Sequence, residues 1–260
     1  MLEDELNITT SPIAAEAGNR VIDIKGLYKA FGENRVLNGF DLDLFEGENL
    51  VVIGKSGSGK SVMIKCLIGL MPPDEGHINV LGKDIINIRQ HMLDKLRSDV
   101  GFLFQGSALY DSMTVRENLE FPMRRHQDKL GKNYNSEELV HEALDNVGLA
   151  HTVDMIPSEL SGGMQRRVAL ARTLILRPKI ILYDEPTSGL DPITAKEIIL
   201  LIMKIKEKYN TSSLIITHDM DCARVIGDRI IILRDGINYA EGLFSDLASS
   251  TDPNLQAFFK

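Results

Sequence analysis

The stretch "VVIGKSGSGKSVMIKCL", from Val51 to Leu67, decides the fold. An apolar run typical of a strand leads into a loop of glycine, serine and lysine, after which apolar residues recur at helical spacing. Glycines let such a loop curl until successive backbone N–H groups point inward, and the following helix adds the partial positive charge of its N-terminus. The stretch therefore predicts a cradle for an anion between a strand and a helix.

The loop fits the phosphate-binding pattern G-x-x-x-x-G-K-S/T. Its residues are Gly54, Lys55, Ser56, Gly57, Ser58, Gly59, Lys60 and Ser61. In this pattern the lysine, Lys60, reaches the β- and γ-phosphates, and the Ser61 hydroxyl binds Mg²⁺. A glycine-rich turn that fits by chance is the alternative, and the strand before it and the helix after it argue against that. We expect a nucleotide to bind here.

A second motif, "IILYDE", runs from Ile180 to Glu185 and ends an apolar strand in two acids. Beside a phosphate loop, a carboxylate in this position holds Mg²⁺, directly or through water, which is the role we expect for Asp184. Glu185 would face the attacking water as a general base, a role that contributes about 10²–10⁴-fold. Alone, the motif would be two solvated acids at a strand end, and only the phosphate loop favours the functional interpretation.

A third motif, "LSGGMQ", begins at Leu160 and contains Ser161, Gly162 and Gly163. It is another serine and glycine turn that opens a helix, so the same physics predicts a second anion site. The alternative is an ordinary helix cap with a flexible entry. The chain has a single phosphate loop but two predicted anion sites. We therefore expect the second site to bind the nucleotide held by another copy of the chain.

The composition argues against several function classes. The net charge is −8, whereas a surface devoted to nucleic acid is usually basic. The two cysteines, Cys66 and Cys222, are far apart and give no disulfide framework or metal-ligand spacing, which suits a reducing compartment. No apolar stretch is long enough to span a bilayer, and the acidic start has no features of a secretory signal. We expect any membrane role to come through a partner.

The apolar pattern alternates between short β-branched runs and helical repeats, which predicts a largely parallel α/β sheet. The expected strands are Val21–Ile24, Leu42–Phe45, Leu50–Ile53, Val100–Phe104, Lys179–Tyr183, Leu214–Thr217 and Arg229–Leu233. Expected helices follow the phosphate loop over Gly59–Leu70, the "LSGG" turn over Met164–Leu176, and the second motif around Ile198–Ile205. Between them, roughly Gly106–Leu160 forms a mostly helical insert, with helix starts at Thr114 and Asn135.

Taken in order, the phosphate loop, Gln105, "LSGG", "IILYDE", "SGLD" and His218 resemble the nucleotide-binding subunit of an ABC transporter, from about Val21 to Leu247. The resemblance implies an α/β fold: a P-loop ABC ATPase with a RecA-like core sheet, an antiparallel β subdomain and a helical subdomain. It implies that two subunits pair head to tail around two ATP molecules. Each ATP would lie between the phosphate loop of one subunit and the "LSGG" turn, the signature turn, of the other. The implied enzyme is an ATPase that uses ATP and Mg²⁺ and drives transport.

Several roles follow only from this resemblance. Phe31 matches the aromatic residue that stacks on adenine. Gln105 matches the residue that senses Mg²⁺ and the attacking water, and His218 matches the histidine that contacts the γ-phosphate. Asp191 matches the aspartate at the dimer seam, while Ser161 and the two glycines after it meet the partner's nucleotide.

The resemblance also implies domain boundaries. Residues 1–20 would be a flexible N-terminal tail and residues 21–248 the ABC ATPase domain. Within it the core lobe would take about 21–105 and 164–248, and the helical subdomain about 106–163. Residues 249–260 would be a short C-terminal tail.

One departure helps to place the subfamily, because Met164 stands where the family's signature usually ends in Gln. The stretches "PSELSGGMQRRVALAR", "YDEPTSGLDPITA" and "STDPNLQAFF" are similar to the ATPases of MCE-associated, Mla-type phospholipid transporters. That similarity implies an integral permease and an MCE-domain lipid-binding protein as partners, at the cytoplasmic face of the bacterial inner membrane. Leu109, Tyr110 and Met113 would receive a permease helix or else pack internally.

Three other functions compete. An importer for a small solute would carry the same motifs, because the permease selects the substrate. A soluble ABC ATPase of a cytosolic assembly complex is the second. A chromosome-repair ATPase is the third, and it is disfavoured because the chain lacks a long coiled coil between the phosphate loop and "LSGG".

Overall fold

The computed structural model describes residues 18–131 and 133–259. The expected N-terminal tail therefore lies almost entirely outside the described residues. Arg20, assigned to that tail, is instead the first residue of a strand, β1.

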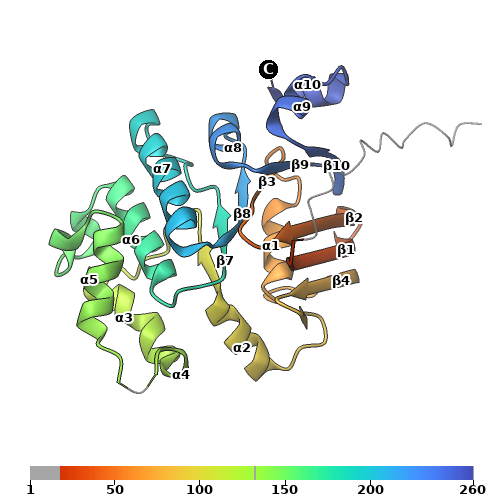
Figure 1. The fold of residues 1–260 in the computed structure, drawn as a ribbon. Coiled ribbons are helices and arrows are strands. Elements are labelled where there is room, and N and C mark those ends of the chain that lie inside the picture. Colours follow the sequence, from red (N-terminus) through yellow and green to blue (C-terminus); the bar gives the residue numbers. More distant parts are fainter. Residues whose placement is uncertain (1–17, 132, 260) are drawn as a thin grey trace, which may run out of the picture.

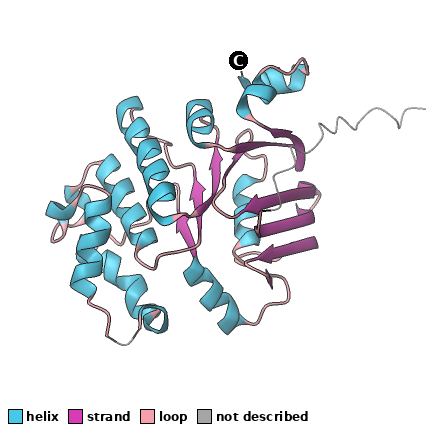
Figure 2. Cartoon of the chain, in the orientation of Figure 1, coloured by secondary structure: helices cyan, strands magenta, loops and turns pink. Residues whose placement is uncertain are grey.

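The centre of the fold is a six-stranded sheet in the order β10-β9-β3-β8-β7-β6. Figure 2 shows strands in magenta with cyan helices on either side. The pairs β9–β3, β3–β8, β8–β7 and β7–β6 are parallel, and only β10 pairs antiparallel. The strands are β3 (Asn49–Ile53), β6 (Val100–Leu103), β7 (Ile180–Asp184), β8 (Ser212–Thr217), β9 (Arg229–Arg234) and β10 (Ile237–Gly242). The expected parallel α/β sheet is confirmed.

The register aligns the carboxyl ends of three neighbouring strands. Ile53 of β3 pairs with Thr217 of β8, and Asp184 of β7 pairs with Ile216 of β8. The phosphate loop begins directly after Ile53, His218 follows Thr217, and Glu185 follows Asp184. Residues distant in sequence thus meet at one edge of the sheet, where open α/β sheets bind ligands.

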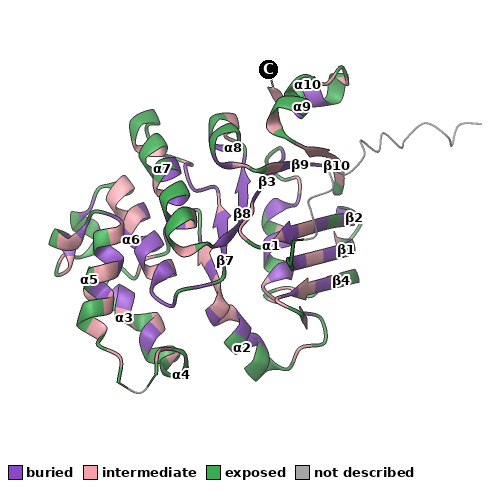
Figure 3. Cartoon of the chain, in the orientation of Figure 1, coloured by how far each residue is buried: buried purple, intermediate pink, exposed green. Residues whose placement is uncertain are grey.

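Alternate side chains of β3 point into two different cores. Leu50 and Val52 pack with helix α1 (Lys60–Leu67) and the antiparallel sheet, while Val51 and Ile53 pack with helices on the opposite face. These helices are α6 (Gly162–Leu174), α7 (Pro192–Tyr209) and α8 (Met220–Ile226). Figure 3 shows the buried central strands between the two layers.

The antiparallel subdomain has the strand order β2-β1-β4-β5 and lies beside α1 (Figure 1). Its strands are β1 (Arg20–Phe31), β2 (Asn34–Phe45), β4 (Glu75–Val80) and β5 (Lys83–Asp84). β1 and β2 are much longer than the expected runs, because exposed charged residues and register shifts interrupt their apolar alternation. Helix α2 (Gln90–Asp99) then leads back to the core sheet.

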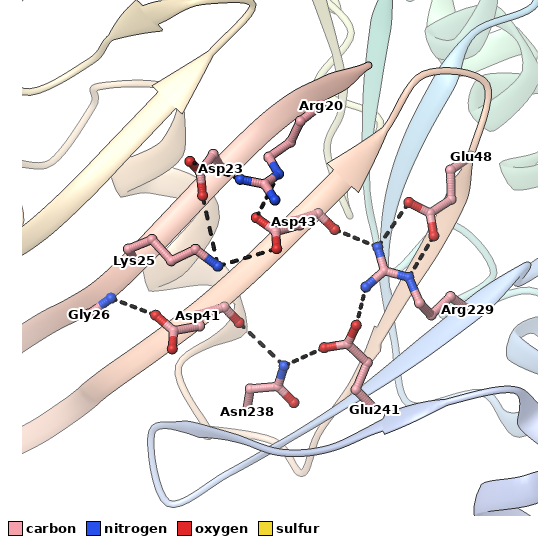
Figure 4. Close-up of polar contacts among 10 residues, drawn as sticks. All are labelled: Arg20, Asp23, Lys25, Gly26, Asp41, Asp43, Glu48, Arg229, Asn238 and Glu241. Carbon is pink, nitrogen blue, oxygen red and sulfur yellow. Dashed lines mark hydrogen bonds and ion pairs between the residues drawn. The ribbon is translucent and has the colours of Figure 1, made fainter. Parts of the chain in front are cut away.

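Arg229 joins the two sheets (Figure 4). From β9, its guanidinium donates to both carboxylate oxygens of Glu48, at 2.7 and 2.9 Å, and to the carbonyl oxygen of Asp43 in β2, at 2.6 Å. It also contacts the Glu241 carboxylate in β10. Bidentate arginine–carboxylate geometry fixes orientation as well as distance, so this residue sets how the antiparallel sheet sits on the core.

A helical subdomain projects from the far edge of the core sheet. It contains α3 (Val115–Arg125), α4 (Gln127–Leu130), α5 (Ser136–Asn146) and the short 3₁₀ turns η1 (Ala150–Thr152) and η2 (Pro157–Glu159). The helix start expected at Thr114 is confirmed as a capping box with Glu117, and the start at Asn135 is confirmed as a side-chain cap on Glu138.

Helix α6 belongs to two hydrophobic cores at once. Its Val168 and Ala171 pack with the helical subdomain, whereas Ala169 and Leu170 pack with the core sheet. The lobe boundary expected near residue 163 therefore runs along this helix rather than in front of it.

The C-terminal segment is folded. After α9 (Phe244–Ala248), residues expected as a short tail form helix α10 (Pro253–Phe259), whose Leu255 is buried. Within the residues described, no helix is both long and apolar enough to cross a membrane.

Candidate nucleotide-binding and catalytic site

The phosphate loop closes around the amine of Lys60. This amine donates to the carbonyl oxygens of Gly54, at 2.6 Å, and of Lys55, at 3.1 Å. Lys60 is the first residue of α1 and is 7% exposed. The loop thus holds a buried cation at the N-terminus of a helix, the arrangement that favours phosphate.

Two loop positions require glycine for steric reasons. A Cβ atom on Gly54 would come within 2.5 Å of the Ser58 hydroxyl oxygen and 2.8 Å of the Leu233 carbonyl oxygen. Gly59 has a φ of 105°, and a Cβ atom there would meet the carbonyl oxygen of Val36 at 2.9 Å. Side chains at these positions would open the cradle, so the glycines set its curvature.

Glu185 occupies the edge formed by β7 and β8. One of its carboxylate oxygens lies 2.8 Å from Nδ1 of His218, and the other lies 3.9 Å from the amine of Lys60. Its backbone has a φ of 51°, and its N–H donates to the carbonyl oxygen of Ile216 at 2.8 Å. A left-handed glutamate stores strain of the kind found at functional sites, and here it turns a largely buried carboxylate toward the phosphate loop.

The charges at this edge are unbalanced. Burial, and then the negative charge of Glu185, raise the pKa of Asp184 above its usual value. Burial lowers the pKa of Lys60, and the charges of Glu185 and Asp184 oppose that shift. Two carboxylates therefore lie beside the ammonium group of Lys60 in a partly desolvated site, and the charge of Lys65 also acts on Asp184. Perturbed groups of this kind gather at functional sites.

These residues suit a magnesium ion. Ser61 follows Lys60 in α1 and offers a hydroxyl oxygen, and Asp184 offers a carboxylate at the end of β7. Hard oxygen donors are the ligands that Mg²⁺ prefers. A divalent cation would favour the ionised form of Asp184, which burial and then the charge of Glu185 disfavour. Gln105, the third expected ligand, comes just after β6 at the same edge, where its amide donates to the Ser188 hydroxyl at 3.4 Å.

Phe31 lies at the end of β1, apart from this cluster. Its ring is 49% exposed, and the Lys29 amine lies 5.8 Å from the ring centroid. The exposed ring belongs to none of the hydrophobic cores of the described residues, so it is available for stacking on a base.

The signature turn is joined to Asp191. Ser161 caps α6 by accepting from the Met164 N–H at 3.3 Å, and Asp191 caps α7 by accepting from Ile193 and Thr194. A Cβ atom on Gly163 would come within 2.5 Å of the Thr194 methyl group, so only glycine permits this contact. Gly162, by contrast, has open space beside it.

The sequence reasoning missed two arginines of α6, one buried and one partly buried. Arg166 is 5% exposed and donates to the carbonyl oxygens of Phe104, at 2.7 Å, and Ser188, at 3.4 Å. Arg172 donates to the carbonyl oxygens of Ser107 and Ala108, two consecutive left-handed residues. Both hold the loop that carries Gln105, and no local pattern reveals contacts over such long sequence separations.

The phosphate loop, Asp184, Glu185 and His218 thus meet at one edge, while the signature turn caps α6, on the opposite side of the core sheet from α1. The model of the ABC transporter family matches residues 37–188. The chain belongs to the ABC transporter family. Its fold and its class, an ABC ATPase, agree with the expectation from the sequence.

Two relatives and one solved structure show how far the likeness extends. A probable ribonucleotide transport ATP-binding protein of Mycobacterium leprae is 43% identical over 212 residues, which cover 82% of this chain and 60% of that protein. The chloroplastic protein TRIGALACTOSYLDIACYLGLYCEROL 3 of Arabidopsis thaliana is 38% identical over 255 residues, which cover 92% of this chain and 73% of that protein. A dimeric, post-hydrolysis structure of the ATP-binding cassette MJ0796, bound to ADP and Pi, has 33% identity, a TM-score of 0.77 and coverage of 86% and 98%.

Proposed function

We propose that the chain is the ATP-hydrolysing subunit of an ABC transporter and that two copies pair head to tail around two ATP molecules. The observation that carries this proposal is Glu185, held between His218 and Lys60 beside the phosphate loop. A carboxylate in that place serves as the base that orients water toward a γ-phosphate.

The chain's own residues divide the work of phosphoryl transfer. Lys60 and the N–H groups of the loop bind the β- and γ-phosphates and stabilise the charge that develops there. Glu185 accepts the proton of the attacking water, and His218, hydrogen-bonded to it, holds that carboxylate in place. Ser61, Asp184 and Gln105 would hold Mg²⁺, which would neutralise negative charge on the phosphate oxygens.

The signature turn supports the paired arrangement. Ser161, Gly162 and Gly163 stand at the N-terminus of α6, where the helix dipole favours an anion. Within its own chain this turn contacts the start of α7, so its cradle remains for the nucleotide of a second copy. Asp191 at the adjoining cap would lie at the seam. The ATP γ-phosphate links the copies, and hydrolysis lets them part.

Lys60→Ala tests nucleotide binding most directly. We expect most of the affinity for ATP to be lost in a fluorescent ATP titration, because the buried amine is the cation of the cradle. Lys204→Ala, which removes an exposed lysine of α7, is the control and should bind ATP normally. Undiminished binding by the Lys60 variant would rule out the proposed site.

For the cargo we propose phospholipid, moved between bacterial membranes with an integral permease and an MCE-domain protein at the cytoplasmic face of the inner membrane. Two facts support this: the stretches quoted above from the sequence, and a relative named for trigalactosyldiacylglycerol, a glycolipid. The alternative is import of a small solute, since another relative is named for ribonucleotide transport. A soluble ABC ATPase of a cytosolic complex is the remaining candidate.

The proposed permease surface lies on the helical subdomain. Tyr110 is 42% exposed, and its ring packs against that of Phe121, itself 38% exposed, at 4.8 Å between centroids. Leu109 instead packs inward against two cores, which favours the internal alternative for that residue.

Co-purification from native membranes distinguishes the cargoes. An integral protein with an MCE protein and bound phospholipid would support lipid transport. A solute-binding protein or a cytosolic complex in their place would contradict it. Tyr110→Ala should release the permease but leave ATP binding unchanged.

A further inference from the structure

A cavity of about 550 Å³ adjoins the outer side of the phosphate loop. Its walls come from four segments that are far apart in sequence. They are residues 34–36 at the start of β2, residues 55–58 of the loop, residues 233–236 at the end of β9 and in the turn after it, and one face of α10. The face of α10 consists of Asn254, Ala257 and Phe258. The volume is within the range of small-molecule sites, which bury most of a ligand of nucleotide size.

Helix α10 is held firmly in place as a wall. Leu255 is buried in the core, and the ring of Phe259 packs edge-on against that of Phe244 at 5.3 Å. The hydroxyl of Tyr239 in β10 donates to Asp252 at 2.6 Å and accepts from the Asn254 amide at 3.0 Å. Asn254 and Phe258 therefore line the cavity from a fixed helix, and Phe258 also packs partly against the core.

The lining combines three kinds of chemistry. Arg35, Lys55 and Arg234 bring positive charge, against the single carboxylate of Asp235. The amides of Asn34 and Asn254 can donate to and accept from hydroxyl groups or ring nitrogens, and Val36 and Phe258 provide apolar surface. Anionic, hydrogen-bonding and flat apolar parts occur together in a nucleoside polyphosphate.

We propose that α10 is a wall of the nucleotide pocket and that Asn254 and Phe258 contact the sugar-and-base end of the ATP whose phosphates lie in the loop. The two side chains are specificity-determining residues, and they line the same cavity as Val36. This inference rests on the proposed nucleotide binding, and it gives the C-terminal helix a function in the same site.

The test compares two ligands by calorimetry. ATP carries phosphates, sugar and base, whereas inorganic tripolyphosphate carries only the phosphate part. We expect Asn254→Ala and Phe258→Ala each to weaken ATP binding about tenfold, which corresponds to about 1.4 kcal/mol. Affinity for tripolyphosphate should not change. Phe258→Leu, which keeps apolar surface, should lose less than Phe258→Ala.

Two further variants complete the design. Gln256→Ala is the matched control, because its amide donates to the Ser250 carbonyl oxygen and its side chain does not line the cavity. Ala257→Phe fills the cavity from an exposed position and keeps the anchors of α10, so it should weaken ATP binding even if Phe258→Ala fails to fold.

Each outcome decides the inference. Unchanged ATP affinity in the folded Asn254 and Ala257 variants overturns it. An equal loss for ATP and tripolyphosphate also overturns it, because the loop rather than the sugar-and-base end would then be affected. Failure of Lys60→Ala to weaken either ligand would instead refute the proposed nucleotide site itself.

Discussion

The carboxylate of Glu185 lies 2.8 Å from Nδ1 of His218, across the carboxyl ends of neighbouring parallel strands. This hydrogen bond joins a residue 8% exposed to an imidazole whose side chain is 66% exposed. The pair is therefore fixed on one side by the core and open on the other to a phosphate or a partner. Its position makes the base of the proposed reaction sensitive to what binds outside.

Glu185→Gln should leave ATP binding intact and lower turnover by about 10²–10⁴-fold, because the amide keeps the shape but cannot accept a proton. Without hydrolysis the γ-phosphate link persists, so we expect an ATP-dependent dimer in size-exclusion chromatography. Glu197→Gln, an exposed acid on α7, is the control and should turn over ATP normally. Lost nucleotide binding in the Glu185 variant would show that its assigned role is wrong.

Asp184→Asn should raise the melting temperature of the nucleotide-free protein at pH 7. Burial, and then the charge of Glu185, raise the pKa of this carboxyl in the folded protein. A carboxyl with a raised pKa contributes its full stability only at pH values below its pKa in the unfolded chain, which is about 3.9. That contribution is lost as the pH rises through the folded value, so the ionised form weakens the fold at pH 7. The advantage of the variant should disappear near pH 4, as measured by thermal unfolding.

Asp191→Asn is the control with the opposite sign. Hydrogen bonds from Thr194 lower the pKa of this carboxyl, so it stabilises the fold above its unfolded pKa, and the stabilisation is lost as the pH falls through the folded value. Its amide should therefore lower the melting temperature at pH 7. Shifts in the same direction for both variants would contradict the electrostatic explanation.

Arg166→Met should lower the turnover number more than the affinity for ATP. The guanidinium donates to the carbonyl oxygen of Phe104, just before Gln105, and to that of Ser188, in the loop that leads to Asp191. Its loss should therefore misplace both of these loops. The next residue offers the control: Arg167 pairs with Glu197, an acid that is half exposed, and exposed pairs contribute little. If Arg166→Met raised KM and left kcat unchanged, the positioning role would be excluded.

Gly163→Ala should destabilise the chain although alanine is the better helix former, because its Cβ atom meets the Thr194 methyl group. Thr194→Ser removes that methyl group and keeps the hydroxyl that binds Asp191. We expect the double variant to recover the melting temperature but not the ATPase activity. Recovery of both would mean that a Cβ atom at position 163 does not obstruct the partner's nucleotide.

Arg229→Met should cost about 3–5 kcal/mol of unfolding free energy, because it leaves the Glu48 carboxylate, 13% exposed, without its bidentate partner. Arg224→Met removes a surface pair with Asp221 and should cost less than about 1 kcal/mol. Urea unfolding measures both. Equal losses would show that the contact between the two sheets is not held by Arg229.

Local patterns in the sequence predicted the elements that surround the phosphate loop. A few neighbouring residues are enough to predict a buried strand such as Ile180–Asp184 or a helix cap such as Thr114. β4 and α2 were missed because exposed polar residues dilute their apolar pattern.

The site was predictable only in part, for a different physical reason. The loop and the paired acids are contiguous, whereas the hydrogen bonds of Arg166 and the anchoring of α10 depend on residues brought together by the fold. A helical pattern near Arg166 does not tell which carbonyl oxygens it will reach. Likewise, the short polar segment before Phe258 did not predict a helix packed on the core.

Helix α6 packs into the core of the central sheet on one side and into the core of the helical subdomain on the other. The two lobes therefore cannot slide past each other along this helix. A swing of the helical subdomain must therefore drag the backbone that Arg166 holds, and with it the amide of Gln105. A partner that pushed on Tyr110 and Phe121 would in this way move Gln105, the residue proposed above to bind Mg²⁺, whatever cargo is transported.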